Sequence, residues 1–222
     1  PIPGAAYIVS SISSISFLVS VSTFSKGSQF FLRIGSGSVR IFLNIYKLYM
    51  LRKILTEPDP ILRKKCEPLE KVDVDTKKLM DDMLATMYAA PGIGLAAVQV
   101  GILKRLVVID ISKGEEEKKP IFLINPQIIH QSKKTSVYEE GCLSLPGQFA
   151  EIERPAECAI QYIDYNGKEK DLKAEGLLAT CIQHEVDHLN GILFIDYLSK
   201  LKKDMIIKKL VKQKKEIERV VV

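Results

Sequence analysis

Two histidines four residues apart, His184 and His188, constrain this chain more than any other feature of its sequence. Residues i and i+4 lie on one face of an α-helix, so both imidazoles can point at one metal ion. Glu185 follows the first histidine, where a carboxylate can take a proton from water bound to that ion. The motif therefore predicts a helix that carries two metal ligands and a general base.

A catalytic site of this kind needs a third protein ligand and an open coordination position. Downstream, Phe194 stands where the H-E-x-x-H-x-x-G-x-x-H pattern has its third histidine, and the two later glutamates lie in a lysine-rich tail. Upstream, Cys142 lies in a short turn-like segment between two predicted strands. A thiolate with two imidazoles suits zinc or ferrous iron, so Cys142 is the predicted third ligand.

No spacing typical of a disulfide framework or of a second metal site relates the other cysteines, Cys66, Cys158 and Cys181. We expect these to be buried free thiols in a protein from a reducing compartment. His130, the third histidine of the chain, is expected at the surface.

Three segments resemble the signature motifs of peptide deformylase, of the bacterial and organellar type 1. They are residues 92–99 (GIGLAAVQ), 140–144 (EGCLS) and 183–188 (QHEVDH), in the order and at the spacing usual for that family. The resemblance extends from about Leu51 to about Leu210. It implies an amide hydrolase that removes the formyl group from the initiator formyl-methionine of nascent polypeptides and releases formate.

The resemblance also implies a role for each group. The metal ligands would be Cys142, His184 and His188. The family points to one ferrous ion, whereas general affinity rules also admit zinc. Glu185 would be the general base that later protonates the leaving amine. The Gln99 side chain and the Leu143 backbone N–H would donate to the oxyanion.

Substrate binding is expected along the Gly94 segment, where an extended peptide can add as a strand. Methionine is long and apolar, so its pocket should be apolar too. The predicted substrate-binding residues are Ile93, Gly94, Glu140, Leu177 and Cys181, although Leu177 fits a core position equally well. Residues 147–149 lack a charged residue often seen there in the family, which leaves the preference beyond methionine open.

The remaining pattern predicts an α+β fold, with mixed or antiparallel β-sheets packed around a central metal-binding helix and a C-terminal helix. Asp75 is predicted to cap a helix whose apolar face carries Leu79, Met83 and Met87. Strands are expected at 105–111 and at 121–124, the latter closed by Asn125-Pro126. An Asn-Gly hairpin should join 159–164 to 168–172, and the metal-binding helix should span about 175–189.

The first 49 residues contain 11 serines, four basic residues and no acidic residue. They are too polar for a membrane span and are expected to lie outside a catalytic domain at 50–222. We expect them to be either translated sequence upstream of Met50 or an organelle transit peptide. Without their four charges the chain has 28 basic and 27 acidic residues, which does not indicate a nucleic-acid-binding protein.

Residues 199–219 predict an amphipathic helix with a lysine-rich face, which is either solvated or contacts the ribosome. The expected partner is a nascent formyl-Met polypeptide, and the chain is expected to be a monomer without a membrane contact. It would act in the bacterial cytoplasm, or in an organelle if the transit-peptide interpretation holds. Two alternatives are an H-E-x-x-H metallopeptidase and an inactive relative that only binds peptides or the ribosome.

Overall fold

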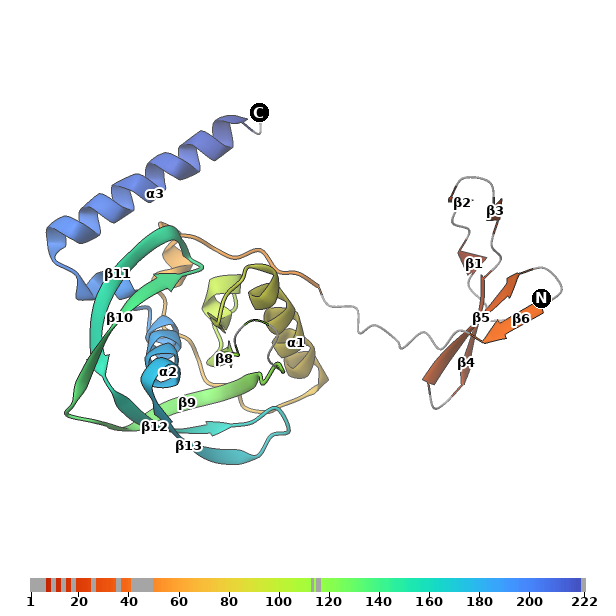
Figure 1. Cartoon of the computed structure of the whole chain (residues 1–222), viewed down its shortest axis with the longest axis horizontal. Helices are drawn as coiled ribbons and strands as arrows, with labels where there is room; N and C mark the ends of the chain where they lie inside the picture. Colours follow the sequence, from red (N-terminus) through yellow and green to blue (C-terminus); the bar gives the residue numbers. More distant parts are fainter. Residues whose placement is uncertain are drawn as a thin grey trace. The chain divides into compact units, whose positions relative to one another are not determined.

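A single helix, α2 (Gly176–Leu189), lies at the centre of the larger of two units into which the chain divides (Figure 1). The computed structural model describes residues 50–112, 114 and 117–220, together with strand residues between 7 and 40. The two units are Pro1–Leu48 and Tyr49–Val222. Within the first unit, the strands form a sheet of order β1-β4-β5-β6 and a β2–β3 hairpin, all antiparallel. Their bounds are β1 Tyr7–Ile8, β2 Ser11–Ile12, β3 Ile15–Ser16, β4 Val19–Phe24, β5 Gly27–Ile34 and β6 Gly37–Arg40.

The second unit is built on an antiparallel sheet of order β13-β12-β9-β8-β7. Its strands are β7 (Gly94–Ala96), β8 (Leu106–Ile109), β9 (Ile121–Gln131), β12 (Glu157–Ile163) and β13 (Glu169–Glu175). A separate hairpin pairs β10 (Thr135–Cys142) with β11 (Leu145–Pro155). Figure 1 shows α2 between this hairpin and the side of the unit that holds α1 (Val74–Ala89). These antiparallel sheets around one helix confirm the predicted α+β fold.

Strand β8, which lies between β9 and β7, explains how two helices share one sheet. Side chains alternate between the two faces of a strand. Val107 and Ile109 belong to the core cluster that contains Ile182 and Val186 of α2. Leu106 and Val108 belong to the cluster that contains Met80, Met83 and Met87 of α1. The two helices therefore cover opposite faces of β8, which is why all four of its residues are buried and apolar.

Helix α1 begins two residues earlier than predicted. Asp73 is the N-cap, because its side chain accepts a hydrogen bond from the Thr76 backbone N–H at 2.9 Å. The prediction that Asp75 caps the helix was wrong, and Asp75 lies in the first turn instead. Both carboxylates are near the helix N-terminus, so the choice between them depends on backbone geometry that spacing does not specify.

Strand β9 does not end at Asn125-Pro126, so that prediction was also wrong. Asn125 adopts a positive φ of 51° and the register with β12 shifts nearby. The Asn125 side chain accepts from the Leu69 N–H and donates to the Leu69 carbonyl, both at 2.8 Å. These bonds secure an irregularity in the strand, and pairing continues to Gln131.

The predicted Asn-Gly hairpin and central helix are confirmed within three residues of their expected bounds. Three short 3-10 helices complete the unit: η1 (Pro60–Arg63), η2 (Ala97–Val100) and η3 (Phe194–Tyr197). Cys66, Cys158 and Cys181 are buried free thiols, and His130 is exposed, as expected.

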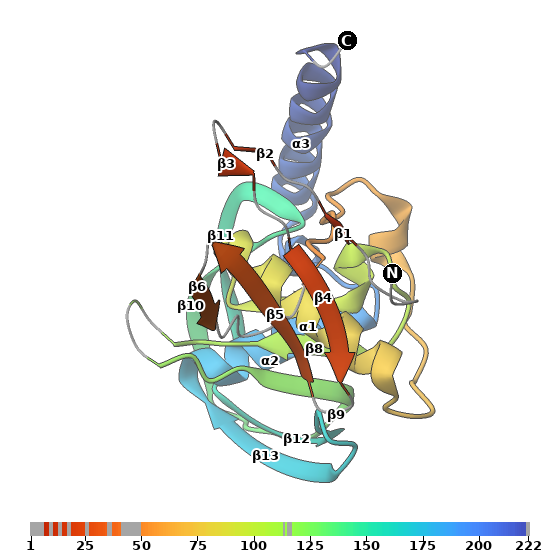
Figure 2. The same cartoon turned by 90° about the vertical axis from the view of Figure 1, so that its right-hand side faces the viewer.

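The predicted C-terminal helix is α3 (Lys200–Val220), which projects from the second unit (Figures 1 and 2). Leu210, at the middle of this helix, is buried in a cluster with Leu145, Phe194 and Ile195. Among the residues that the structure describes, no helix is both long and apolar enough to cross a membrane.

Candidate metal centre

The structure brings Cys142, His184 and His188 together. Their ligand atoms all lie within 4.8 Å of one another, and both histidines are buried. The Cys142 Sγ is 3.2 Å from the His188 Nε2. The two imidazole rings are 4.9 Å apart and nearly perpendicular, as expected for ligands that approach one ion from different directions. One thiolate and two imidazoles form a donor set suited to a transition metal with an open position.

Cys142 is presented by an irregular end of the β10–β11 hairpin. The strand register shifts between Gly141 and Cys142, so the cysteine lies where regular pairing stops. The Ser144 N–H and the Gln99 side-chain amide both point at its Sγ, at 3.4 and 3.5 Å. These contacts hold the sulfur next to the two histidines of α2.

His184 is oriented by a buried carboxylate. The Glu140 Oε2 lies 2.8 Å from the His184 Nδ1, which leaves the other ring nitrogen to bind a metal. Arg154 donates to both oxygens of Glu140, with its Nε at 2.5 Å and its Nη2 at 3.1 Å. Burial alone would raise the pKa of Glu140, but the hydrogen bonds from His184 and Arg154 lower it below its ordinary value. Glu140, which was predicted to bind substrate, lines the cavity described below, and its carboxylate is bonded to His184 and Arg154.

Two partners of this network were not predicted from the sequence. Arg154 Nη1 donates to the Asp187 Oδ2 at 2.7 Å, and the Tyr197 hydroxyl donates to the same oxygen at 2.8 Å. Arg154 is almost fully buried and lies over the Tyr197 ring, 4.8 Å from its centre. Its position one residue before the end of β11 gives no sign of this role, because Glu140 and Asp187 lie 14 and 33 residues away in the sequence.

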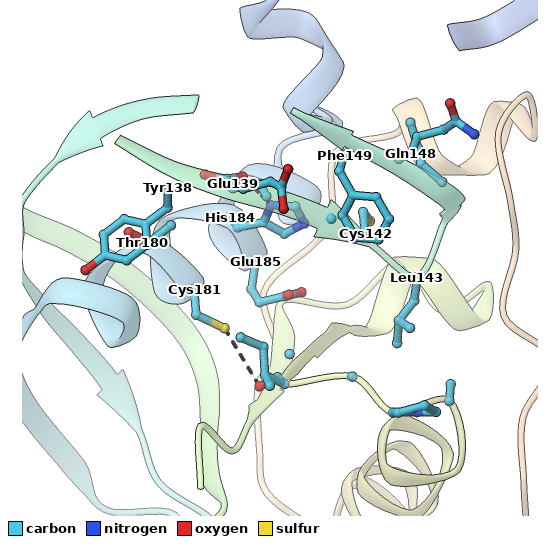
Figure 3. A pocket seen from close by; sticks show the side chains of 18 of the residues that line it. Tyr138, Glu139, Cys142, Leu143, Gln148, Phe149, Thr180, Cys181, His184 and Glu185 are labelled. Atoms are coloured by element: carbon cyan, nitrogen blue, oxygen red, sulfur yellow. Dashed lines mark hydrogen bonds and ion pairs between the residues drawn. The ribbon is translucent and has the colours of Figure 1, made fainter. Parts of the chain in front are cut away.

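Glu185 faces the cavity next to the ligands (Figure 3). It is buried, and its Oε2 has no hydrogen-bond partner among the described residues. Burial raises the pKa of Glu185 to about 7, although the charge of His184 opposes that rise. A carboxyl group with its pKa near neutrality can both accept and return a proton, which a general acid–base catalyst must do.

Gly94 lies directly against this carboxylate. A Cβ at Gly94 would overlap the Glu185 Oε1 and would lie 2.9 Å from the Cys181 Sγ. Glycine is therefore required here by close approach of the backbone to the site.

Gln99 is fixed by its own backbone. The Ala96 N–H donates to the Gln99 Oε1 at 2.8 Å, so the amide Nε2 must face the other way. That nitrogen lies 3.1 Å from the Ser144 Oγ and points at Cys142. Gln99 thus presents an N–H donor at the metal centre, from the short helix η2.

A cavity of about 420 Å³ opens beside the ligands. The remaining predicted substrate-binding residues Ile93, Gly94, Leu177 and Cys181 all line it, together with the Leu143 segment. The Cys181 Sγ points at the Ile93 carbonyl at 3.8 Å, and burial raises the pKa of its thiol well above the ordinary value (Figure 3). Cys181 is therefore a neutral, weakly polar part of the wall, suited to an apolar side chain.

The comparisons with known proteins identify the family. A sequence model described as polypeptide deformylase matches residues 51–204. The peptide deformylase of Pelagibacter ubique (strain HTCC1062) is 63% identical over 164 residues, which cover 74% of this chain and 95% of that relative. This chain belongs to the polypeptide deformylase family. Members of the family remove the N-formyl group from nascent chains, so the predicted family and reaction are confirmed.

Solved deformylase structures share the fold. The crystal structure of peptide deformylase from Ehrlichia chaffeensis is 45% identical, with a TM-score of 0.72, and the match covers 75% of this chain and 98% of that one. A Met-Ala-Ser-bound class I type b deformylase from Acinetobacter baumannii is 31% identical, with a TM-score of 0.65, over 68% of this chain and 100% of that one. The metallopeptidase alternative gains no support from these matches.

Proposed function

We propose that this chain hydrolyses the N-formyl group of the initiator methionine on nascent polypeptides at the Cys142, His184 and His188 centre. The observation that carries this proposal is the three-donor group beside an apolar cavity, with the carboxylate of Glu185 between them. An inactive binding module would have no need of that arrangement, because peptide binding requires neither metal ligands nor a base.

The three donors would hold one divalent ion, and Glu140 keeps His184 in the orientation that binding requires. When bound, such an ion polarises the formyl carbonyl and lowers the pKa of water, so that hydroxide is available near neutral pH. Glu185 accepts the proton of the attacking water through its unpartnered oxygen. It then donates this proton to the leaving amine, which frees the amino terminus and formate.

The oxyanion that develops on the formyl oxygen is stabilised by two N–H donors. One is the Gln99 amide, whose orientation is fixed by Ala96. The other is the backbone N–H of Leu143, which follows the cysteine ligand. The Gln99 amide is already oriented toward the metal centre before the substrate arrives.

The methionine side chain enters the cavity against Ile93, Leu177 and Cys181, while the peptide backbone runs along Gly94. Strand β7 is at one end of its sheet, so its outer edge can accept an extended peptide. The Met-Ala-Ser-bound relative from Acinetobacter baumannii supports a peptide of this kind as ligand.

The proposed physiological ion is ferrous iron, with zinc as a less active substitute. A Cys-His-His set admits both ions, so the metal must be measured in protein purified without oxygen. Iron content that parallels activity, together with loss of activity in air, would support iron. Full activity with zinc alone would contradict it.

The lysine-rich face of α3 is proposed to contact the ribosome, in the cytoplasm of a bacterium, with the enzyme itself a monomer. Nine basic and three acidic residues lie between Lys200 and Arg219, and Leu201 and Met205 are exposed on the same helix. Light scattering tests the monomer. Cosedimentation with ribosomes should weaken when four of the lysines are replaced by glutamate, and unchanged cosedimentation would refute the contact.

Residues 1–49 are proposed to lie outside the catalytic fold, because the family match begins at residue 51. The deciding experiment measures anaerobic turnover of formyl-Met-Ala-Ser by the full chain and by residues 50–222, each loaded with ferrous iron. We expect equal release of formate and free amine from both. Glu185→Gln should keep its metal but lose turnover by about 10²-fold or more. No release from folded, metal-loaded protein would refute the proposed function.

A further inference from the structure

We propose that Phe149 forms the wall that receives the side chain directly after formyl-methionine, and that it makes the enzyme prefer an apolar residue at that position. This inference rests on the proposed function, because it concerns the peptide that the same cavity binds. The sequence alone did not indicate which residue the enzyme prefers after formyl-methionine, and Phe149 bears on that preference.

The Phe149 ring lines the cavity and lies against the backbone of the neighbouring strand. It lies in β11 directly opposite Gly141 of β10. A Cβ on Gly141 would be 2.6 Å from the Phe149 Cε1 and 2.8 Å from its Cδ1, so the ring rests against the glycine backbone. Gly141 precedes the metal ligand Cys142, which fixes the ring close to the reacting centre.

The phenylalanine is 65% exposed although it lines the cavity. Ile93, which also lines the cavity, is 42% exposed. The Leu143 side chain lies against Gly92, since a Cβ on Gly92 would lie 2.7 Å from the Leu143 Cδ1. Large apolar side chains left in water around a cavity are typical of surfaces that a ligand covers.

The direction of the bound peptide selects which of its side chains meets Phe149. Figure 3 shows Tyr138, Thr180 and Cys181 on one side of Glu185, and Leu143 and Phe149 on the other. The methionine side chain occupies the Cys181 side. Successive side chains of an extended peptide point in opposite directions, so the second one turns toward Phe149 and the third turns back.

Charge excludes acidic residues from the same place. The segment from Leu143 to Phe149 contains no charged residue. The described residues that line the cavity include the carboxylates of Glu139, Glu140 and Glu185 but no lysine or arginine. A carboxylate on the second residue would thus lose water without a lysine or arginine of the cavity wall to pair with it.

The test compares kcat/KM for formyl-Met-Leu-Ser, formyl-Met-Ala-Ser and formyl-Met-Glu-Ser, with the full chain loaded with ferrous iron. The wild type should rank leucine above alanine and alanine above glutamate. Phe149→Ala should reduce the leucine-to-alanine ratio about fivefold, the order expected when one partly buried apolar contact is lost. Phe149→Arg should raise glutamate above alanine, because it supplies the missing cation.

Ile129→Ala is the matched control, since Ile129 is 53% exposed on β9 and does not line the cavity. Its ratios should equal those of the wild type. Phe149→Leu keeps an apolar side chain and should give an intermediate ratio, which guards against a folding defect of the smaller variant. Unchanged ratios in the folded alanine and arginine variants would overturn the inference.

Failure of the proposed function would be visible separately, as absence of formate from all three peptides with the wild type. In that event, calorimetric titration with Met-Leu-Ser and Met-Ala-Ser still measures the preference. Tighter binding of the leucine peptide, lost in Phe149→Ala, would support the inference. Equal binding of both peptides would overturn it.

Discussion

Replacing Gly94 with alanine should disable the proposed base while leaving every metal ligand in place. The new methyl group would overlap the Glu185 Oε1 and would approach the Cys181 Sγ to 2.9 Å. Both neighbours are buried in α2, a helix held by the core, so neither can move away freely. The strain must therefore displace the carboxylate, the β7 backbone or both.

The size of the effect follows from contact distances. Carbon atoms in proteins approach other heavy atoms to about 3.5–4.0 Å, so relief of the overlap requires a movement of about 1 Å. A misplacement of about 1 Å at a reacting group can lower the rate about 10²-fold. Overpacking a buried site costs about 1–3 kcal/mol, which corresponds to a Tm lower by about 5 °C in a domain of this size.

The assay measures kcat for formyl-Met-Ala-Ser, bound iron by elemental analysis, and Tm by calorimetry. Gly92→Ala is the comparison, because its tightest contacts would be with the Leu143 side chain, at 2.7 Å from Cδ1 and 3.3 Å from Cγ, and that flexible side chain can rotate away. We expect Gly94→Ala to lose about 10²-fold in kcat with full metal content, and Gly92→Ala to lose much less. A folded Gly94→Ala variant with near-normal kcat would refute the close-approach explanation.

Three further predictions concern the surroundings of the site and the fold. Glu140→Gln should weaken metal affinity about 10-fold to 100-fold, measured by chelator competition, because it removes the carboxylate that orients a ligand; unchanged affinity would contradict this. Metal removal should lower Tm, and restored metal should recover it, since an ion that binds only the folded state stabilises it. Asp82→Asn should lower the free energy of unfolding by about 1–2 kcal/mol at pH 7. Burial would raise the pKa of Asp82, but bonds from the Met50 N–H, Lys78 and Arg52 lower it overall. The difference between wild type and Asp82→Asn in urea titrations should therefore be full above about pH 4 and shrink as the pH falls below it. A difference that is constant down to pH 2 would refute that assignment.

The sequence was most informative where a local spacing translates directly into geometry. Two histidines at i and i+4 must share a helix face, and the structure does place both on the buried side of α2. The Asn-Gly hairpin is a second example, because its turn geometry depends on adjacent residues alone. Cys142 is different, since its approach to the histidines across 42 residues of chain was inferred from the missing ligand and from family resemblance.

The predictions of helix and strand ends were wrong where two alternative local conformations have similar energies. Asp73 and Asp75 could each cap α1, and only the backbone path decides which carboxylate reaches the Thr76 N–H. Asn125-Pro126 is a strong turn signal, yet the bonds between Asn125 and Leu69 let β9 continue. Leu69 is 56 residues away, so no window of neighbouring sequence contains the information.

Asp187 shows why a short motif conceals part of a site. In H-E-x-x-H it counts only as a spacer, but residues on a helix advance by about 100°, so it lies about 60° to one side of His184 and about 100° from His188. There it binds Arg154, which also binds the carboxylate that orients His184. One buried cation therefore joins the helix that carries the ligands to the strand that directs them. Because Arg154 cannot be left unpaired without a large cost, helix and hairpin are held in the one relative position that completes the metal site.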